Sequence, residues 1–257
     1  MRPVLALLTD FGTRDHYVAA MKGVILGIAP DATIVDITHE VSPQDVLGGA
    51  LVLEGCVTCF PAGTVFLAVV DPGVGSPRRG IAAEAGGYHF VGPDNGVLSL
   101  AIASAGRARV VTLTDPHYAR PAVSRTFEGR DRFAPAAAWF ATGVALDAFG
   151  PAIDDWTRIA LPFVEHEGES IVGEVIHIDR FGNLMTNIRL DDVPVHVVIA
   201  GTDVPGVATY SIVAPGALCA LIGSTGRVEI AVNGGSAAAR LTLGRGARVI
   251  VVAPDRR

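Results

Sequence analysis

The first 150 residues alternate short apolar runs with stretches in which apolar side chains recur at helical spacing. Apolar runs at residues 4–8, 33–37 and 64–70 predict buried strands. Helical spacing follows the first run, between Asp15 and Ile28, and Ser42 with Pro43 is typical of the first turn of a second helix. Because crossover helices join parallel strands, this alternation predicts an α/β domain with a mostly parallel sheet.

The same pattern continues and then changes. Further strands are predicted at residues 81–85, 88–91 and 109–113, and a helix at 133–142. Two prolines and mixed charges interrupt the periodicity within residues 151–170. Beyond them, short alternating runs are separated by turn residues, with no convincing helix between them. We therefore predict an α/β domain over residues 1–163 and a smaller all-β, barrel-like domain over 170–257.

Composition narrows the functional classes. The chain has 257 residues, of which half are hydrophobic, and a net charge of −6, so neither nucleic acid nor a membrane is an expected partner. Cys56 and Cys59 form one CxxC without a second ligand pair, so we expect these cysteines and Cys219 to be buried small residues rather than metal ligands. The N-terminal apolar run is too short for a signal peptide, and no run is long enough to span a membrane. A cytoplasmic location is predicted.

Two predicted strands end on carboxylates. Asp10 follows the first strand, and Asp71 follows the run 64–70 and opens a loop rich in Gly and Pro that leads to Arg78 and Arg79. Ligands of open α/β sheets bind beyond the carboxyl ends of the strands. If the loop stood alone, a turn capped by Asp71 would be the favoured interpretation, and the other motifs of the chain shift the balance.

Several motifs together indicate a family. The stretches are LLTDFGTRDHYVAAMKG, VVDPGVGSPRRG, GPDNG, TFEGRDRFAPAAA and IDRFGNLMTNI. In this order they resemble the S-adenosylmethionine hydroxide adenosyltransferases, also called S-adenosylmethionine hydrolases, which are relatives of the fluorinase and chlorinase. The resemblance spans nearly the whole chain. It implies an α/β domain followed by a β-barrel, and hydrolysis of S-adenosylmethionine to adenosine and methionine without a cofactor or metal. It also implies a homotrimer whose substrate lies between the N-terminal domain of one subunit and the C-terminal domain of the next.

The resemblance assigns roles in the first domain. Asp10 matches the aspartate that accepts hydrogen bonds from the ribose hydroxyls. Asp71 and Arg78 match two of the three residues that hold the attacking water, and Arg79 is the neighbouring alternative to Arg78. The third position is usually His in this family, whereas this chain has Glu128. Glu128 could replace His as the proton acceptor, could point away, or could leave turnover weak.

In the second domain, the resemblance places further residues around the substrate. Asn183 would read the adenine edge, and Phe181 would stack near the base or simply pack. Glu229 would pair with the substrate ammonium or remain a solvated strand carboxylate. The full set in this domain is Asp179, Phe181, Asn183, Ser224, Glu229 and Val232, the last through its backbone alone.

Three other functions stay open at this stage. A halogenase would have to hold a halide beside Asp71 and Glu128, which like-charge repulsion disfavours. A non-catalytic binder of S-adenosylmethionine or adenosine would be compatible with the change from His to Glu. A metal-dependent phosphohydrolase could use Asp10 and Asp71 to hold Mg²⁺, although the sequence contains no phosphate-binding loop.

Overall fold

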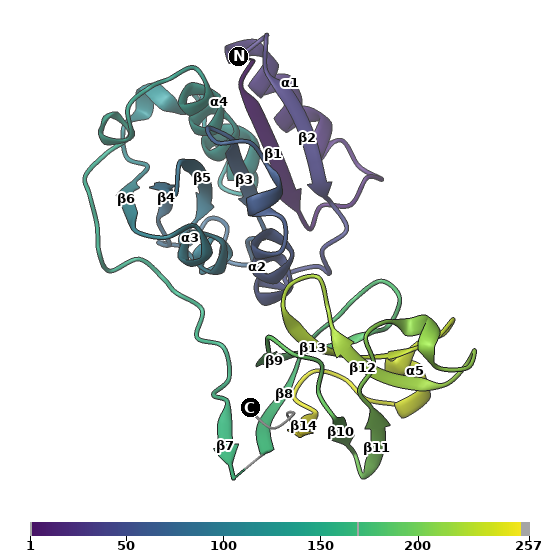
Figure 1. The fold of residues 1–257 in the computed structure, drawn as a ribbon. Helices are drawn as coiled ribbons and strands as arrows, with labels where there is room; N and C mark the ends of the chain where they lie inside the picture. The colour runs from purple at the N-terminus through teal and green to yellow at the C-terminus, as the bar shows by residue number, and fades with distance from the viewer. Residues whose placement is uncertain (1, 169, 253–257) are drawn as a thin grey trace. The chain divides into compact units, whose positions relative to one another are not determined.

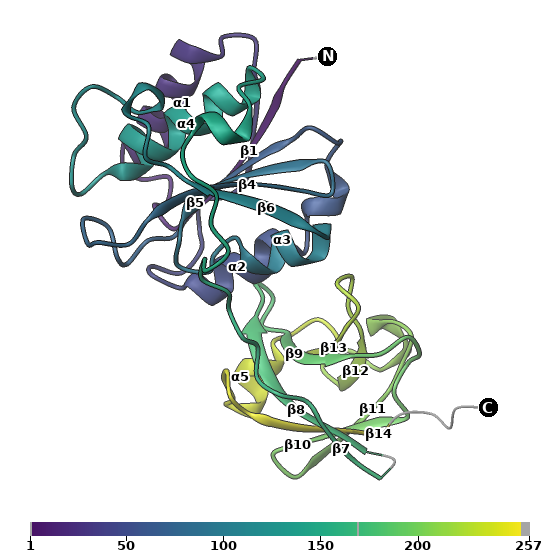
Figure 2. The same ribbon diagram turned by 90° about the vertical axis from the view of Figure 1, so that its left-hand side faces the viewer.

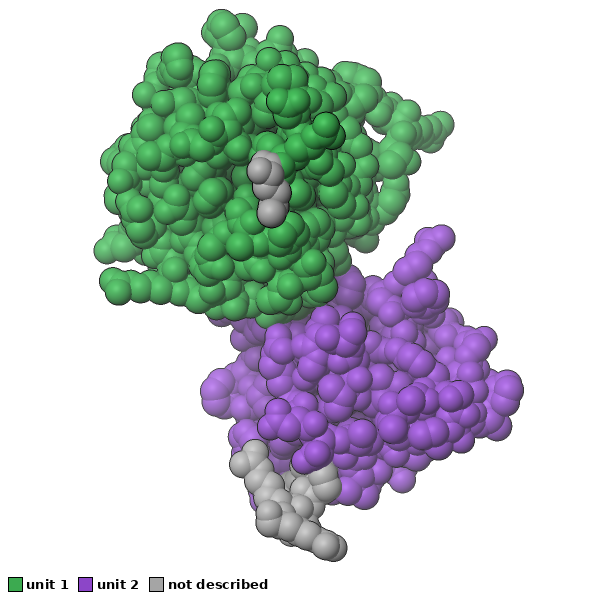
Figure 3. Space-filling model, turned by 45° about the horizontal axis from the view of Figure 1, so that its top comes forward, with its two compact units in different colours: residues 1–159 green, residues 160–257 purple. Residues whose placement is uncertain are grey.

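A computed structural model describes residues 2–168 and 170–252. The chain divides into two compact units, residues 1–159 and 160–257 (Figure 3). In the described part of the chain, no helix has both the length and the apolar character needed to cross a membrane.

The first unit is built on a six-stranded sheet with the order β2-β1-β3-β5-β4-β6. Its first four strands pair in parallel, whereas β4 pairs antiparallel with both of its neighbours. The mostly parallel sheet predicted from the sequence is therefore confirmed. The strands are β1 (Val4–Thr9), β2 (Thr33–Thr38), β3 (Val65–Val69), β4 (Gly80–Ala85), β5 (Tyr88–Pro93) and β6 (Ala108–Thr112).

Helices cover both faces of this sheet, with α1 and α4 on one face and α2 and α3 on the other (Figure 2). Each face has its own core: Met21 and Phe140 belong to one, and Leu53 and Ile102 to the other. Such three-layer packing explains why the strands are apolar on both faces. The helices are α1 (Tyr17–Ile28), α2 (Val46–Glu54), α3 (Ser99–Ala105) and α4 (Ala134–Ala141).

The register of β1 and β3 positions the predicted carboxylates. Leu5 pairs with Val65 and Thr9 with Val69, so these parallel strands end at the same edge of the sheet (Figure 1). Asp10 and Asp71 follow these two strand ends. The expectation that both acids reach one edge of the sheet is met.

The second unit is a nearly closed antiparallel barrel. The order is β11-β10-β14-β8-β9-β13-β12, with β7 beside β8. After β11, the Val207 amide donates to the Ala220 carbonyl of β12 over 2.8 Å, so the two ends of the sheet meet. The strands are β7 (Glu165–Glu167), β8 (Ser170–Ile178), β9 (Leu184–Arg189), β10 (His196–Ile199), β11 (Thr202–Pro205), β12 (Leu218–Ile222), β13 (Arg227–Val232) and β14 (Arg248–Val252).

Three local expectations are wrong. Helix α2 starts at Val46 with Asp45 as its cap, because the Asp45 side chain accepts the Gly48 amide, so Ser42 is not the cap. A short helix, α5 (Ala237–Leu241), lies between β13 and β14 and was not predicted. Cys59 is exposed rather than buried.

Candidate functional site

A loop of the first unit carries Asp71 from β3 to Arg78. Within it, Gly75 has a left-handed backbone with φ of +79°, and a Cβ there would lie 2.5 Å from the carbonyl oxygen of Arg125. Only glycine lets the loop approach the 123–127 segment so closely. The loop that holds Asp71 is thereby packed against the segment that leads to Glu128.

Arg78 is the cation that contacts Asp71. Its Nε donates to Asp71 Oδ1 over 2.9 Å and its Nη2 donates to Asp71 Oδ2, which makes a two-point fork. The Arg78 Nη2 atom also donates to Glu128 Oε2. All three side chains are nearly buried, with exposed fractions of 10%, 5% and 11% for Arg78, Asp71 and Glu128. The planar guanidinium thus holds both carboxylates in a fixed geometry.

The neighbouring Arg79 points elsewhere. Its Nε donates to Asp94 Oδ2 over 2.9 Å and its Nη1 to Asp155 Oδ1 over 2.8 Å. These two partners account for the raised pKa of Arg79, with Asp155 the larger contributor. The geometry therefore favours Arg78 over Arg79 as the arginine of the site.

Glu128 is held where an irregular helix begins. A π-helical turn over Gly129–Phe133 precedes α4, and such turns are frequent at functional sites. Arg132 lies one turn beyond Glu128, with its Nη2 at 3.5 Å from Glu128 Oε1. The guanidinium of Arg78 also lies 5.0 Å from the ring centroid of Phe133. Two cations thus balance the charges of Asp71 and Glu128.

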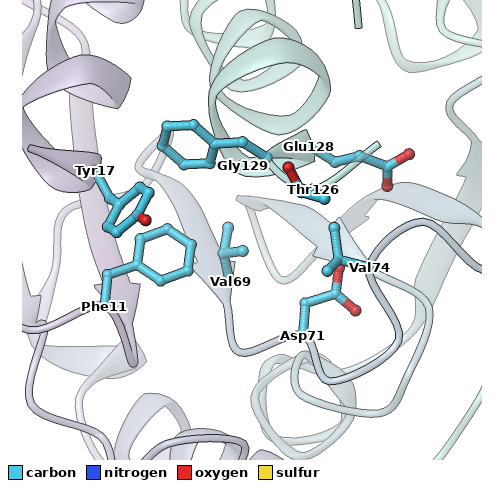
Figure 4. A pocket seen from close by; sticks show the side chains of 9 residues that line it. Phe11, Tyr17, Val69, Asp71, Val74, Thr126, Glu128 and Gly129 are labelled. Carbon is cyan, nitrogen blue, oxygen red and sulfur yellow. The ribbon is translucent and has the colours of Figure 1, made fainter. Parts of the chain in front are cut away.

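A pocket of about 150 Å³ opens beside these carboxylates. Figure 4 shows Phe11 and Tyr17 on one side of it and Asp71 and Glu128 on the other, with Val69 between them. The ring centroids of Tyr17 and Phe127 are 5.1 Å apart in an edge-on arrangement, which stabilises the aromatic wall. One wall can therefore pack against an apolar or flat group while the other accepts hydrogen bonds.

Asp10 is not one of the residues that line this pocket, but its neighbour Phe11 is. The carboxylate of Asp10 accepts the Gln44 amide through Oδ2 over 2.8 Å. Gln44 has a left-handed backbone with φ of 67°, which is uncommon for a residue other than glycine. The Gln44 amide thus holds the Asp10 carboxylate through one of its two oxygens.

The second unit contains a larger pocket of about 940 Å³. All six residues predicted for this unit line it, so the barrel brings together residues that lie 53 positions apart in the sequence (179 to 232). No Lys, Arg or His is among the described residues that line the pocket. The lining consists of Asp179, Phe181, Asn183, Ala208, Thr209, Tyr210, Leu221, Ile222, Gly223, Ser224, Glu229, Val232, Gly234 and Gly235.

Asp179 organises the turn between β8 and β9. Its Oδ1 accepts the amides of Phe181 and Asn183, and its Oδ2 accepts the Asn183 side-chain amide, each over 2.9 Å. The ring of Phe181 is 75% exposed, whereas Asn183 is buried. Asp179 therefore fixes the side chain of Asn183, and Phe181 stands free to contact a ligand.

Glu229 is a buried carboxylate of β13 with a neutral partner. The Tyr210 hydroxyl donates to its Oε1 over 2.7 Å. Burial raises the pKa of Glu229, the Tyr210 hydrogen bond lowers it, and the nearby Asp179 raises it further, with a net upward shift. The pKa of Tyr210 is also raised, by burial and then by this hydrogen bond. A cation that entered the pocket would relieve the buried charge of Glu229.

Sequence reasoning missed several lining residues. Phe11 and Tyr17 lie inside the first motif, so their position beside Asp10 was an available signal. Thr126 likewise precedes Glu128 in its motif. Tyr210 begins a short 3₁₀ helix, Tyr210–Ile212, 19 residues before Glu229, and no spacing rule connects the two.

The described side chains do not bring three or more His, Cys, Asp or Glu residues together in a metal-binding arrangement. The two carboxylates at the carboxyl ends of β1 and β3 have protein partners, Gln44 for Asp10 and Arg78 for Asp71.

Comparison with known proteins gives consistent matches. Models of the SAM hydroxide adenosyltransferase N-terminal and C-terminal domains match residues 5–150 and 173–250. A curated protein of Salinispora tropica named (R)-S-adenosyl-L-methionine hydrolase is 42% identical over 98% of both chains. A fluorinase of Nocardia brasiliensis is 30% identical over 74% of this chain and 73% of that protein. The crystal structure of an uncharacterized conserved protein from Thermotoga maritima superposes with a TM-score of 0.88 at 35% identity, covering 96% of this chain and 99% of that one.

Proposed function

The chain belongs to the SAM hydroxide adenosyltransferase family, and we propose that it hydrolyses S-adenosylmethionine to adenosine and methionine. The observation that carries the proposal is the fork of Arg78 on Asp71 at the wall of a pocket with an aromatic opposite side. This arrangement suits a reaction in which one water must be aimed at carbon.

The chemistry asks little of the protein beyond positioning. The water oxygen forms a bond to the 5′ carbon of the adenosyl group, and the bond from that carbon to sulfur breaks. The electron pair of the broken bond stays on sulfur, so methionine leaves as a neutral thioether and needs no acid. Holding water and carbon in line can supply about 7–11 kcal/mol of the barrier in the best intramolecular cases.

We assign Asp71 as the acceptor of the proton that the water loses. A general base must lie within hydrogen-bond reach of its water, and Asp71 lines the pocket with its carboxylate fixed by Arg78. Glu128 shares the same guanidinium and also contacts Arg132, so its charge is balanced from two sides. We assign Glu128 to holding Arg78 and the water, at the position where the resemblance implies His.

Substrate contacts follow from the two pockets. We assign Asp10 to the ribose hydroxyls and Asn183 to the adenine edge, with Phe181 stacking near the base. We assign Glu229 to the substrate ammonium, with Ser224 and the Val232 backbone at the same end. Asp179 acts on this end chiefly through the turn that it organises.

The active form in this proposal is a cytoplasmic homotrimer that uses no cofactor. Each site would take its first-unit residues from one subunit and its second-unit residues from the next. Sedimentation measurements on the purified protein test the assembly, and a monomer with full activity would contradict it.

The resemblance implies His at position 128, and the Glu of this chain favours a second candidate, a non-catalytic binder. The two are separated by chromatography of S-adenosylmethionine incubated with the purified protein. We expect adenosine and methionine in equal amounts, unchanged by a chelator and without 5′-halo-adenosine in chloride or fluoride. Retention of S-adenosylmethionine without products would support the binder, a halogenated product the halogenase, and loss of activity with chelator a metal-dependent enzyme.

A further inference from the structure

A line of polar groups runs under the turn that follows β1. The Phe11 amide donates to Thr9 Oγ1 over 3.2 Å, and Thr9 Oγ1 lies 2.8 Å from His39 Nδ1. His39 Nε2 in turn lies 3.0 Å from Asp36 Oδ1, and Lys22 Nζ donates to Asp36 Oδ2 over 2.6 Å. Thr9 is fully buried and His39 is 5% exposed.

The chemistry of the groups sets the direction of this line. Thr9 Oγ1 accepts from Phe11 and keeps one hydrogen and one lone pair, so it can bond to Nδ1 of either His39 tautomer. We infer the tautomer with its hydrogen on Nε2, because this nitrogen lies 3.0 Å from the Asp36 carboxylate; the contact acts through charge, since it is not aligned as a hydrogen bond. Burial raises the pKa of Asp36, but its contacts with Lys22 and His39 outweigh burial and lower it, so Asp36 is an anion that fixes this tautomer.

This series of polar contacts, from Lys22 to the Phe11 amide, ends at the turn that carries Asp10 and Phe11. Phe11 lines the first pocket, and Asp10 stands between Thr9 and Phe11. The turn is held from the His39 segment a second time, because the Gly12 amide donates to the His39 carbonyl over 2.7 Å. Both contacts of His39, through its ring and its backbone, therefore act on residues 9–12.

We propose that Thr9 and His39 are positioning residues, which hold the Asp10–Phe11 turn in the shape that binds the nucleoside part of the substrate. The inference rests on the proposed function for the identity of the ligand. The role of Thr9 can be tested separately from that function: its hydroxyl, through the Phe11 amide, contributes to ligand binding in addition to any contribution to folding. Asp10 and Phe11 would contact the nucleoside before and during the reaction alike, so loss of the turn should raise KM and leave kcat nearly unchanged.

The chain offers a matched control. Thr64 is also buried, with 1% exposed, and its hydroxyl donates one hydrogen bond, to the Pro61 carbonyl over 2.8 Å. It precedes β3, so it lies at the opposite edge of the same sheet from Thr9. Thr9→Val and Thr64→Val each remove one buried hydroxyl at nearly constant volume, but only the first touches the turn.

The experiment measures KM and kcat for S-adenosylmethionine, and the Kd of adenosine by calorimetry, in the unaltered protein and the variants. We expect Thr9→Val to raise both KM and Kd by about three- to tenfold, the worth of one hydrogen bond, with kcat within about twofold. Thr64→Val should change none of these by more than about twofold. Thr9→Ser, which keeps the hydroxyl, should restore both constants.

A second variant tests the same inference if Thr9→Val does not fold. Asp36→Asn alters a side chain that is 41% exposed, and it removes the charge that fixes the His39 tautomer. We expect about a threefold rise in KM and Kd together with a change in the ¹⁵N shifts of the His39 ring.

The outcomes are distinguishable from failure of the proposed function. A protein that binds adenosine but forms none from S-adenosylmethionine would refute the hydrolase, and the adenosine Kd of the variants would still decide this inference. Equal effects of Thr9→Val and Thr64→Val, no restoration by Thr9→Ser, or no adenosine binding by the unaltered protein would each overturn it.

Discussion

The carboxylates in the pockets of the two units have opposite kinds of partner. In the first unit, Asp71 and Glu128 share the guanidinium of Arg78, and Arg132 stands on the far side of Glu128. In the second unit, Glu229 and Asp179 have only neutral donors among their described hydrogen-bond partners: a tyrosine hydroxyl, backbone amides and one side-chain amide.

This difference in charge indicates which kind of ligand each pocket can bind. A charge-balanced cluster can hold a neutral molecule such as water without attracting ions from solvent. An acidic pocket without a cation of its own favours a positively charged ligand, because such a ligand supplies the missing counter-charge. The second pocket therefore suits a substrate that carries a cationic sulfonium and an ammonium group. The first pocket suits the water molecule that attacks this substrate.

The largest effect is expected from removing the cation of the balanced cluster. Arg78→Met leaves Asp71 and Glu128 close together without their shared partner, which costs about 3–5 kcal/mol of unfolding free energy for a buried pair. We expect kcat to fall about 10³-fold or more. Kinetics and chemical denaturation measure both effects.

Arg79→Met is the matched control for that variant, because Arg79 binds Asp94 and Asp155 instead. It should lose stability but keep kcat within about threefold. A larger loss of kcat in Arg79→Met than in Arg78→Met would refute the assignment of Arg78.

Next in size is the effect of neutralising Asp71, the residue that we assign as proton acceptor. Asp71→Asn keeps the shape of the side chain but not its basicity, so we expect kcat to fall about 10²–10³-fold. Binding of S-adenosylmethionine, measured by calorimetry, should change by less than about threefold. Unchanged turnover would remove Asp71 from the mechanism.

The corresponding change in the second unit should act on binding. Glu229→Gln removes the carboxylate that we assign to the substrate ammonium, so we expect KM to rise about 30-fold, the worth of a hydrogen bond to a charged group, with kcat nearly constant. A fall in kcat without a change in KM would show that the second pocket takes part in the chemical step instead.

The stability of the same variant should depend on pH. Because the pKa of Glu229 in the folded protein lies above its ordinary 4.5, the folded state holds its proton more tightly than the unfolded state. The unfolding free energy of the unaltered protein therefore falls as pH rises from about 4.5 through the raised pKa. The unfolding free energy of Glu229→Gln should not fall in this way, so the variant should become more stable relative to the unaltered protein as the pH rises over that range. A difference in unfolding free energy that does not change with pH would contradict this prediction.

Glu128→Gln tests whether the balanced cluster needs both of its acids. Arg78 keeps its fork on Asp71 in this variant, so we expect only about a tenfold loss of kcat. A loss as large as that of Asp71→Asn would make Glu128 the proton acceptor.

The smallest effect is expected at Tyr210. Tyr210→Phe removes the hydrogen bond that lowers the pKa of Glu229, so that pKa should rise further. KM should increase about threefold at neutral pH. As the pH is lowered, the further increase of KM should begin at a higher pH in the variant than in the unaltered protein. Tyr88→Phe, which loses a hydrogen bond to the Phe60 carbonyl in the first unit, is the control and should leave the profile unchanged.

Much of the fold was predictable because the strands are apolar runs of ordinary length. The sheet, its helices and the change to an all-β second unit follow from period and turn residues. The start of α2 was misplaced because Ser42 and Asp45 are both good caps, and only the Asp45 side chain reaches the Gly48 amide. Helix α5 is too short for periodicity to reveal.

The sequence nominated the residues of the candidate site but did not predict the contacts between them. The resemblance assigned Asp71, Arg78 and Glu128 to one site. It did not predict that a single guanidinium contacts both acids, because this contact depends on how the loop that carries Arg78 packs against the π-helical turn. Tyr210 was missed for the same reason, since its partner Glu229 lies on a strand that it meets only when the barrel closes.

The central claim is that a water molecule held at Asp71 and Arg78 attacks the 5′ carbon of the adenosyl group. The direct measurement is mass spectrometry of adenosine formed by the purified protein from S-adenosylmethionine in water enriched in ¹⁸O. The account predicts one heavy oxygen at the 5′ position of each adenosine, formed at a rate that Asp71→Asn sharply reduces. Adenosine without the label, or label incorporated at the same rate in Asp71→Asn, would contradict it.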